Sequence, residues 1–174
     1  MSSTESQTHK EAMVIAPGDG EVILRGDVGL IRKISAASGG AIAVVECPLE
    51  PGALAAPPHT HADADEYAFV IEGEIGVLLG EETFRAAAGS YVLKPRGLSH
   101  TFWNVGPEPA RILEIVSPAG FEQYFVELGE ILSSTPAGQP PDFARIAEMA
   151  GRYGTTFQME RLPEIMEKHG VELR

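Results

Sequence analysis

The chain has a single cysteine, Cys47, so it cannot form an internal disulfide bond. A lone thiol fits a reducing compartment, where structural disulfides are rare. The first eleven residues are polar and have neither the apolar centre of a secretory signal peptide nor the Arg-rich face of a transit peptide. No apolar run reaches the length of about 18 residues that a membrane-spanning helix needs. We therefore expect a cytoplasmic protein.

Basic residues are also scarce. The 174 residues include 13 Lys and Arg against 25 Asp and Glu, which gives a formal net charge of −12. A surface of this sign repels nucleic-acid phosphates and anionic lipids, so we expect neither a nucleic acid nor a membrane as a partner. Apolar residues make up 44% and charged residues 22%, which is typical of one globular domain with a real hydrophobic core.

The first two thirds of the chain consist of short apolar or alternating runs that Gly and Pro interrupt. Many short runs at this spacing are typical of an all-β sandwich or barrel. The predicted strands are Glu21–Arg25, Val28–Ile34, Ala41–Pro48, Glu66–Glu72, Ile75–Leu79, Thr83–Ala86, Ser90–Lys94, Thr101–Asn104 and Arg111–Ser117. This number of strands favours a jelly roll, in which closure or the packing of two sheets protects most strand edges.

After Ser117 the pattern changes from alternation to helical spacing. Apolar residues recur every three or four positions over 121–132, which predicts an amphipathic helix. Asp142 is predicted as the N-cap of a second helix that extends to about Tyr153, and residues 163–169 are predicted as a third.

These patterns divide the chain into three parts. We expect a disordered tail over residues 1–12, a β-barrel over 13–118 and a helical extension over 119–174, within which residues 135–141 form a Pro/Gly linker. The extension is too short to fold alone, so it is expected to pack on the barrel or on a second subunit.

Two short segments contain three of the five histidines of the chain. His59 and His61 lie two residues apart, so both imidazoles point to the same face of an extended strand. Glu66 follows a short acidic loop and begins an apolar run, and His100 follows a predicted turn. Strands of one barrel can bring these four side chains together.

Three neutral imidazoles and one carboxylate are a donor set for a divalent ion of intermediate softness, such as Fe, Mn, Ni, Co or Zn. Four protein ligands leave coordination positions open to water, oxygen or substrate, which is typical of a catalytic metal site. The ion together with Glu66 would carry about one net positive charge, which suits an enolate or carboxylate ligand. Glu66 has an alternative role as a general base beside the metal.

The two segments resemble the paired motifs of the cupin superfamily. The matching residues are His59, His61, Glu66 and Gly73 in the first motif and Gly89, Pro95, Gly97, His100 and Asn104 in the second. Gly52 lies one residue farther from His59 than the family pattern has it, which affects a turn and not a ligand. The resemblance covers roughly residues 40–118. It implies a double-stranded β-helix (jelly-roll) barrel, followed here by C-terminal helices, and one divalent metal ion.

A single barrel followed by helices and an Arg-Tyr-Gly segment at 152–154 resembles the small quercetin 2,3-dioxygenase-like members of that superfamily. This resemblance implies a metal-dependent dioxygenase that acts on a small aromatic or enol substrate, with Glu66 as its catalytic proton acceptor, and it implies a homodimer. The same scaffold also carries binding proteins without turnover and metal-dependent isomerases or lyases. These remain the alternatives.

Alternation along the strands predicts which other side chains face the metal. The residues that share the inward face with the ligands are Ala68, Val70, Phe102 and Asn104. They are candidates for binding the substrate, and ordinary barrel core is the alternative. For Asn104, tying a turn through its amide is a further alternative.

The same alternation sends Trp103 and Tyr67 outward, beneath the C-terminal helices or into a subunit contact. Arg96 is expected to pair with an acid at the rim of the barrel. The loop acids Asp63 and Asp65 are expected to be solvated.

Overall fold

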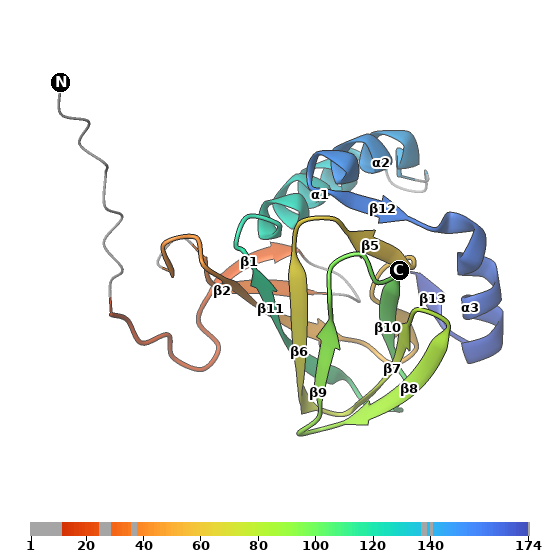
Figure 1. Ribbon diagram of the computed structural model, residues 1–174, viewed down its shortest axis with the longest axis horizontal. Helices are drawn as coiled ribbons and strands as arrows, with labels where there is room; N and C mark the ends of the chain where they lie inside the picture. The colour runs from red at the N-terminus through yellow and green to blue at the C-terminus, as the bar shows by residue number, and fades with distance from the viewer. Residues whose placement is uncertain (1–11, 25–28, 36–37, 137–138, 140, 174) are drawn as a thin grey trace.

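The computed structural model describes residues 12–24, 29–35, 38–136, 139 and 141–173. Two largely antiparallel sheets face each other, with α1 and α2 at one end and α3 beside the second sheet (Figure 1). The first sheet has the order β1 (Glu21–Leu24), β2 (Leu30–Ile34), β3 (Ala43–Leu49), β11 (Ala110–Ser117), β6 (Asp65–Glu72) and β9 (Tyr91–Lys94). The second has the order β12 (Thr155–Phe157), β5 (His59–His61), β10 (His100–Asn104), β4 (Ala53–Leu54) and β13 (Glu172–Leu173), and β7 (Glu74–Leu79) joins β10 to β8 (Glu82–Ala87).

The predicted all-β jelly roll with C-terminal helices is confirmed, and each predicted strand has its counterpart within the described residues. The ends predicted at Arg25 and Val28, and the tail over 1–11, lie outside the described residues. Of the two arrangements expected of a jelly roll, the described strands adopt the packing of two sheets with separate edges and not closure. The chain passes from β6 in one sheet to β7 in the other through Gly73 alone, whose φ of 77° favours glycine. An added Cβ there would lie 2.9 Å from Ala110, so the sheet switch depends on this residue.

The main hydrophobic core fills the space between the sheets. Its members come from the inward positions of strands in both, among them Val45, Cys47, Val70, Val77 and Ile112. Burial alternates strictly along β3 and β11, as the sequence pattern predicts for strands with one face in the core.

The C-terminal part forms α1 (Glu122–Ser134), α2 (Phe143–Arg152), a 3₁₀ turn η2 (Met159–Arg161) and α3 (Leu162–His169). Helices α1 and α2 cover a second apolar cluster that includes Phe121, Tyr124 and Met149. Helix α3 covers a third, in which Trp103 is buried against Ile165 and Val171. No helix among the described residues has the length and apolar character that crossing a bilayer requires.

Two strands of the C-terminal part were not predicted. Strand β12 pairs antiparallel with β5, and β13 pairs parallel with β4. With three and two residues, both are too short for an alternating pattern to be recognised, so they exist because of the strands they join and not because of local propensity. The extension is therefore part of the second sheet as well as a helical cover.

The predicted N-cap at Asp142 is confirmed, since its carboxylate accepts a hydrogen bond from the backbone N–H of Arg145 at 3.0 Å. Replacing Asp142 with alanine should lower the free energy of unfolding by about 1 kcal/mol, because one N–H of the first turn loses its acceptor. Urea denaturation measures this loss. Asp142→Asn retains an acceptor oxygen and should lose much less; equal losses for the two variants would contradict a capping role.

Candidate metal centre

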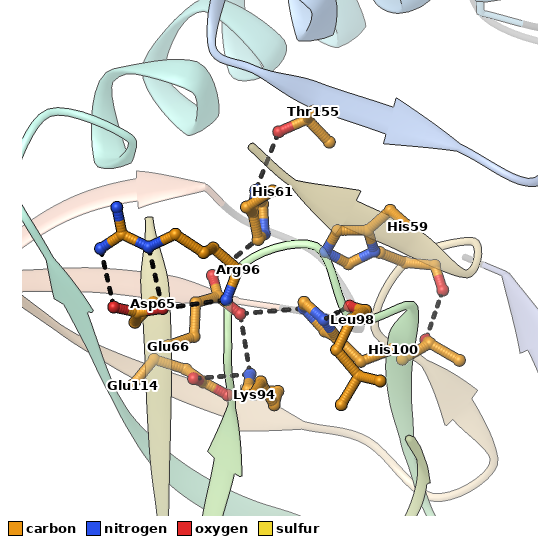
Figure 2. Close-up of polar contacts among 12 residues, drawn as sticks. His59, His61, Asp65, Glu66, Lys94, Arg96, Leu98, His100, Glu114 and Thr155 are labelled. Atoms are coloured by element: carbon orange, nitrogen blue, oxygen red, sulfur yellow. Dashed lines mark hydrogen bonds and ion pairs between the residues drawn. The ribbon is translucent and has the colours of Figure 1, made fainter. Parts of the chain in front are cut away.

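The four predicted ligands lie together between the two sheets. His59 and His61 come from β5, His100 comes from the adjacent β10, and Glu66 reaches across from β6 (Figure 2). One potential ligand atom of each side chain can be chosen so that all four lie within 4.8 Å of one another. Two strands of one sheet and one strand of the other therefore form the group.

His59 and His100 are held in the same way. The Nδ1 atom of His59 lies 2.8 Å from the backbone oxygen of Pro57, and that of His100 lies 2.9 Å from the oxygen of Leu98. A carbonyl oxygen can only accept, so each Nδ1 carries the hydrogen. The lone pair of each ring is then on Nε2, the atom available for a metal ion.

His61 differs in its partner. Its Nδ1 lies 3.0 Å from the hydroxyl oxygen of Thr155, on β12. Its Nε2 is buried and has no hydrogen-bond partner among the described residues. A buried polar atom without a partner is costly, and a metal ion at the centre of the group would satisfy it.

Glu66 connects the group. Its Oε1 lies 3.4 Å from Nε2 of His61, and its Oε2 lies 3.2 Å from Nε2 of His100 and 2.9 Å from the ammonium of Lys94. Burial opposes ionisation, but the Lys94 ammonium, followed by the adjacent imidazoles of His100 and His61, outweighs it and holds the pKa of Glu66 well below its usual value. The carboxylate is therefore ionised and ready to act as a ligand.

The imidazoles of His59 and His100 are kept neutral. Burial, followed by the proximity of the other two rings, lowers the pKa of His59 to about 3. Burial also lowers the pKa of His100, against the opposing effect of Glu66. A neutral imidazole has the free lone pair that metal coordination requires, so these rings do not have to lose a proton at neutral pH before they bind.

Sequence reasoning missed two charged residues in the same interior. Lys94, with 1% of its side chain exposed, lies 2.8 Å from Oε2 of Glu114 as well as 2.9 Å from Glu66. The two carboxylates outweigh burial and raise the pKa of Lys94. Burial, with the negative charge of Glu66, raises the pKa of Glu114 to about 7 despite the ammonium. The sequence offers a signal only for Glu114, which occupies an inward position in the middle of β11, whereas Lys94 ends a strand of four residues.

The structure separates the candidate substrate-binding residues into three that lie in the interior between the sheets and one that belongs to a turn. Ala68 and Val70 are buried in the main core, and the ring of Phe102 lies 5.0 Å from the Lys94 nitrogen. The amide of Asn104 donates to the backbone oxygens of Leu49 and Glu108, and its oxygen accepts from Gly106. These contacts belong to a turn and favour the turn role of Asn104.

Three other expectations have clear outcomes. Trp103 points outward and is buried beneath α3, whereas Tyr67 points outward and remains 43% exposed. Arg96 pairs with Asp65 at 2.7 Å, as expected of a rim arginine. The expectation that Asp65 is simply solvated is wrong, because the Arg96 side chain and backbone N–H both donate to it and lower its pKa to about 2.

The residues present fit a divalent metal ion. Three imidazoles have Nδ1 held by partners outside the group, one Nε2 is buried without a partner, and one ionised carboxylate completes the set. Nitrogen and carboxylate oxygen together suit Fe, Mn, Ni, Co or Zn, and the donor set does not select among them.

Comparison with known proteins agrees with this geometry. Residues 45–116, which contain all four ligands, match the family described as Cupin domain. The polyketide synthase CurC of Streptomyces cyaneus is 34% identical over 79 residues, which are 45% of this chain and 49% of that protein. Germin-like protein subfamily T member 2 of Arabidopsis thaliana is 42% identical over 62 residues, 33% of this chain and 28% of the other. The chain thus spans about half or less of the length of these relatives.

Solved structures share the fold. A double-stranded β-helix protein from Klebsiella pneumoniae superposes with a TM-score of 0.53 at 22% identity, over 63% of this chain and 93% of that one. A variant of oxalate decarboxylase from Bacillus subtilis gives 0.51 at 23% identity, over 62% of this chain and 33% of the other. At these identities the likeness concerns the fold alone.

Proposed function

We propose that this chain, whose residues 45–116 match the Cupin domain family, is a metal-dependent dioxygenase that acts on a small aromatic or enol substrate. The observation that carries the metal-dependent part is the unpartnered, buried Nε2 of His61 beside the ionised Glu66, with all three Nδ1 atoms held from outside. The choice of dioxygenase rests on the resemblance to the quercetin 2,3-dioxygenase-like proteins.

A bound divalent ion would supply Lewis acidity and open positions for a substrate oxygen and for dioxygen. His59, His61 and His100 would hold it through Nε2. Glu66, which is ionised and lies beside two of the rings, would bind it and accept the proton of the substrate hydroxyl, since a general base acts within hydrogen-bond reach. Glu66 is thus the proposed catalytic residue.

The charges of the interior favour an anionic substrate oxygen. Lys94 lies between Glu66 and Glu114, and the pKa of about 7 leaves Glu114 partly protonated, so these groups with a divalent ion would keep at least about one net positive charge. An enolate or phenolate carries the single negative charge that this site would neutralise. We propose Ala68, Val70 and Phe102 as the apolar wall for such a substrate. Asn104 is retained only as a turn residue.

Oxygen uptake tests the proposal. Protein reconstituted without air with Fe(II), Mn(II), Co(II) or Ni(II) should consume oxygen when a flavonol or a β-diketone is added. Glu66→Gln should reduce the rate by about 100-fold or more, because it removes a ligand and the proton acceptor together. Glu82→Gln, on the exposed face of β8, is the matched control and should retain the wild-type rate. Absence of uptake with every metal and substrate would end the dioxygenase proposal.

The same experiment distinguishes the alternatives. Conversion of a substrate under argon indicates a metal-dependent isomerase or lyase with the same ligands. Metal and ligand binding without conversion indicates a binding protein. Both outcomes retain the metal centre and replace only the reaction.

We also propose that the protein is a homodimer. On the outer face of β6 and β9, Tyr67, Tyr91 and Leu93 remain 43%, 83% and 54% exposed, and Tyr67 lies opposite Leu93 in the sheet. A second copy would remove this apolar face from water. Sedimentation equilibrium tests the assembly. The cytoplasmic location and the lack of nucleic-acid or membrane partners stay predictions from composition.

A further inference from the structure

We propose that the C-terminal segment completes the metal centre, with Thr155 as a positioning residue that keeps Nε2 of His61 free for the metal ion. This inference rests on the metal-binding part of the proposed function and not on the dioxygenase reaction. It assigns a role to a residue that lies 94 positions away from the histidine it contacts.

The C-terminal segment docks along one edge of β5. Strand β12 lies along the whole of β5, with Thr155 opposite His61 and Phe157 opposite His59. Backbone hydrogen bonds continue at both ends, from the N–H of Ala62 to the oxygen of Gly154 at 2.8 Å and from the N–H of Gln158 to the oxygen of Pro58 at 2.8 Å. The strand that carries two ligands is therefore flanked by β10 on one edge and by the C-terminal segment on the other (Figure 1).

The Arg-Tyr-Gly segment at 152–154 connects the end of α2 to β12. Arg152 and Tyr153 both donate to the carboxylate of Glu127 on α1, which fixes the end of α2. Gly154 then turns the chain into β12 with a φ of 66°, in the left-handed region, and an added Cβ would lie 2.9 Å from Oδ2 of Asp63. This segment thus directs Thr155 toward His61.

The tautomer of His61 depends on a side chain, unlike the tautomers of His59 and His100. The Nδ1 atoms of His59 and His100 face backbone oxygens, which can only accept, so their tautomers are fixed by the backbone near them in sequence. The Nδ1 of His61 faces only the Thr155 hydroxyl at 3.0 Å (Figure 2). As an acceptor, this hydroxyl keeps the hydrogen on Nδ1 and leaves Nε2 free.

Without the Thr155 hydroxyl, the preferred tautomer of His61 changes. A buried Nδ1–H would have lost its acceptor, and moving the hydrogen to Nε2 would let that atom donate to Oε1 of Glu66, 3.4 Å away. His61 and Glu66 would then be hydrogen-bonded to each other instead of coordinating the metal. Metal binding and the docking of residues 153–158 are therefore expected to support each other, since each favours the same tautomer.

Three variants test this inference, with Co(II) and Zn(II) as probes in competition with a chromophoric chelator. Thr155→Val keeps the shape and removes the hydroxyl, and it should weaken metal binding by about 10-fold or more. Thr155→Ser restores a hydroxyl and should bind within a few-fold of wild type. Thr156→Val makes the same chemical change on the exposed neighbour in β12 and should leave the affinity unchanged.

Three further measurements separate positioning from a loss of folding. The melting temperatures of the metal-free variants should agree with that of the wild type, and the ¹⁵N chemical shifts of His61 should move toward the Nε2–H tautomer only in Thr155→Val. Hydrogen exchange in residues 153–158 should slow on metal addition in the wild type and slow less in Thr155→Val. Wild-type affinity in Thr155→Val would overturn this inference alone, whereas a wild-type protein that binds no metal would overturn the metal centre as well.

Discussion

Replacing Lys94 with methionine should lower the free energy of unfolding by about 3–5 kcal/mol, the largest loss expected from any single substitution considered for this protein. Methionine approximates the length of lysine and fits an apolar surrounding, so the loss measures the missing charge more than a missing volume. Without the ammonium, Glu66 and Glu114 are two buried carboxylates with no lysine or arginine partner among the described residues. Urea denaturation of metal-free protein near pH 7 measures the loss.

The matched control is an ion pair at the surface. Arg85 pairs with Glu74 at 2.7 Å, and the arginine side chain is 66% exposed. Arg85→Met should cost less than about 1 kcal/mol, because water already solvates both charges. Similar losses for the two variants would show that the burial of Lys94 has no energetic consequence.

The pH dependence of the unfolding free energy tests whether Lys94 stabilises the protein through the ionised Glu66. In the wild type the pKa of Glu66 is held below its usual value, so this group contributes stability above its unfolded pKa and loses that contribution as the pH falls. Lys94→Met removes the cation responsible. The difference in unfolding free energy between the two proteins should therefore be largest near neutral pH and should narrow in acid. A difference that widens in acid would contradict this assignment.

A second substitution in the same cluster should be non-additive. In Lys94→Met, changing Glu114 to Gln removes one of the two unpaired carboxylates, so the double variant should be more stable than Lys94→Met alone by on the order of 1 kcal/mol. In the wild type, Glu114→Gln should instead destabilise, because it removes a partner of Lys94 at 2.8 Å. Equal effects in both backgrounds would mean that the two side chains do not act on each other.

Lys94 was not predicted as part of the site, whereas the main strands and the four ligands were. Strands such as β3 and β11 were predictable because each is a run of seven or eight mostly apolar residues with Gly or Pro on both sides, and the ligands because two dense motifs fix their types and spacing. Lys94 is a single charge at the end of a four-residue strand, where no pattern distinguishes inward from outward. Only the register that places Lys94 opposite Glu66 makes it part of the site.

Thr155 was unpredictable for a different reason. Its strand has three residues and forms by pairing with β5, far away in the sequence. Threonine has no composition signal for a role beside a histidine, since its hydroxyl more often serves turns and caps. Local patterns thus predicted the ligands, and tertiary pairing determined what orients them.

Replacing both His59 and His61 with alanine should remove the metal from the protein. The double variant retains only Glu66 and His100 of the four ligands. Zinc sites with four protein ligands owe about 10–16 kcal/mol to coordination, so the loss of two ligands should weaken affinity by roughly a thousandfold or more. Elemental analysis of freshly purified protein should therefore fall from near one equivalent of metal to almost none, and thermal denaturation should no longer respond to added Co(II) or Zn(II).

The control for this variant is the one described histidine outside the group. His169 lies against Trp103 with ring centroids 4.3 Å apart, on the outer side of the second sheet. His169→Ala removes an imidazole without touching a ligand, so its metal content should equal that of the wild type. The circular dichroism spectrum of the double variant should retain the β-sheet signal, because the apolar clusters that hold the sheets together keep all their members. A folded double variant with unchanged metal content would mean that any bound ion lies elsewhere in the molecule, and the proposed reaction would then have no centre.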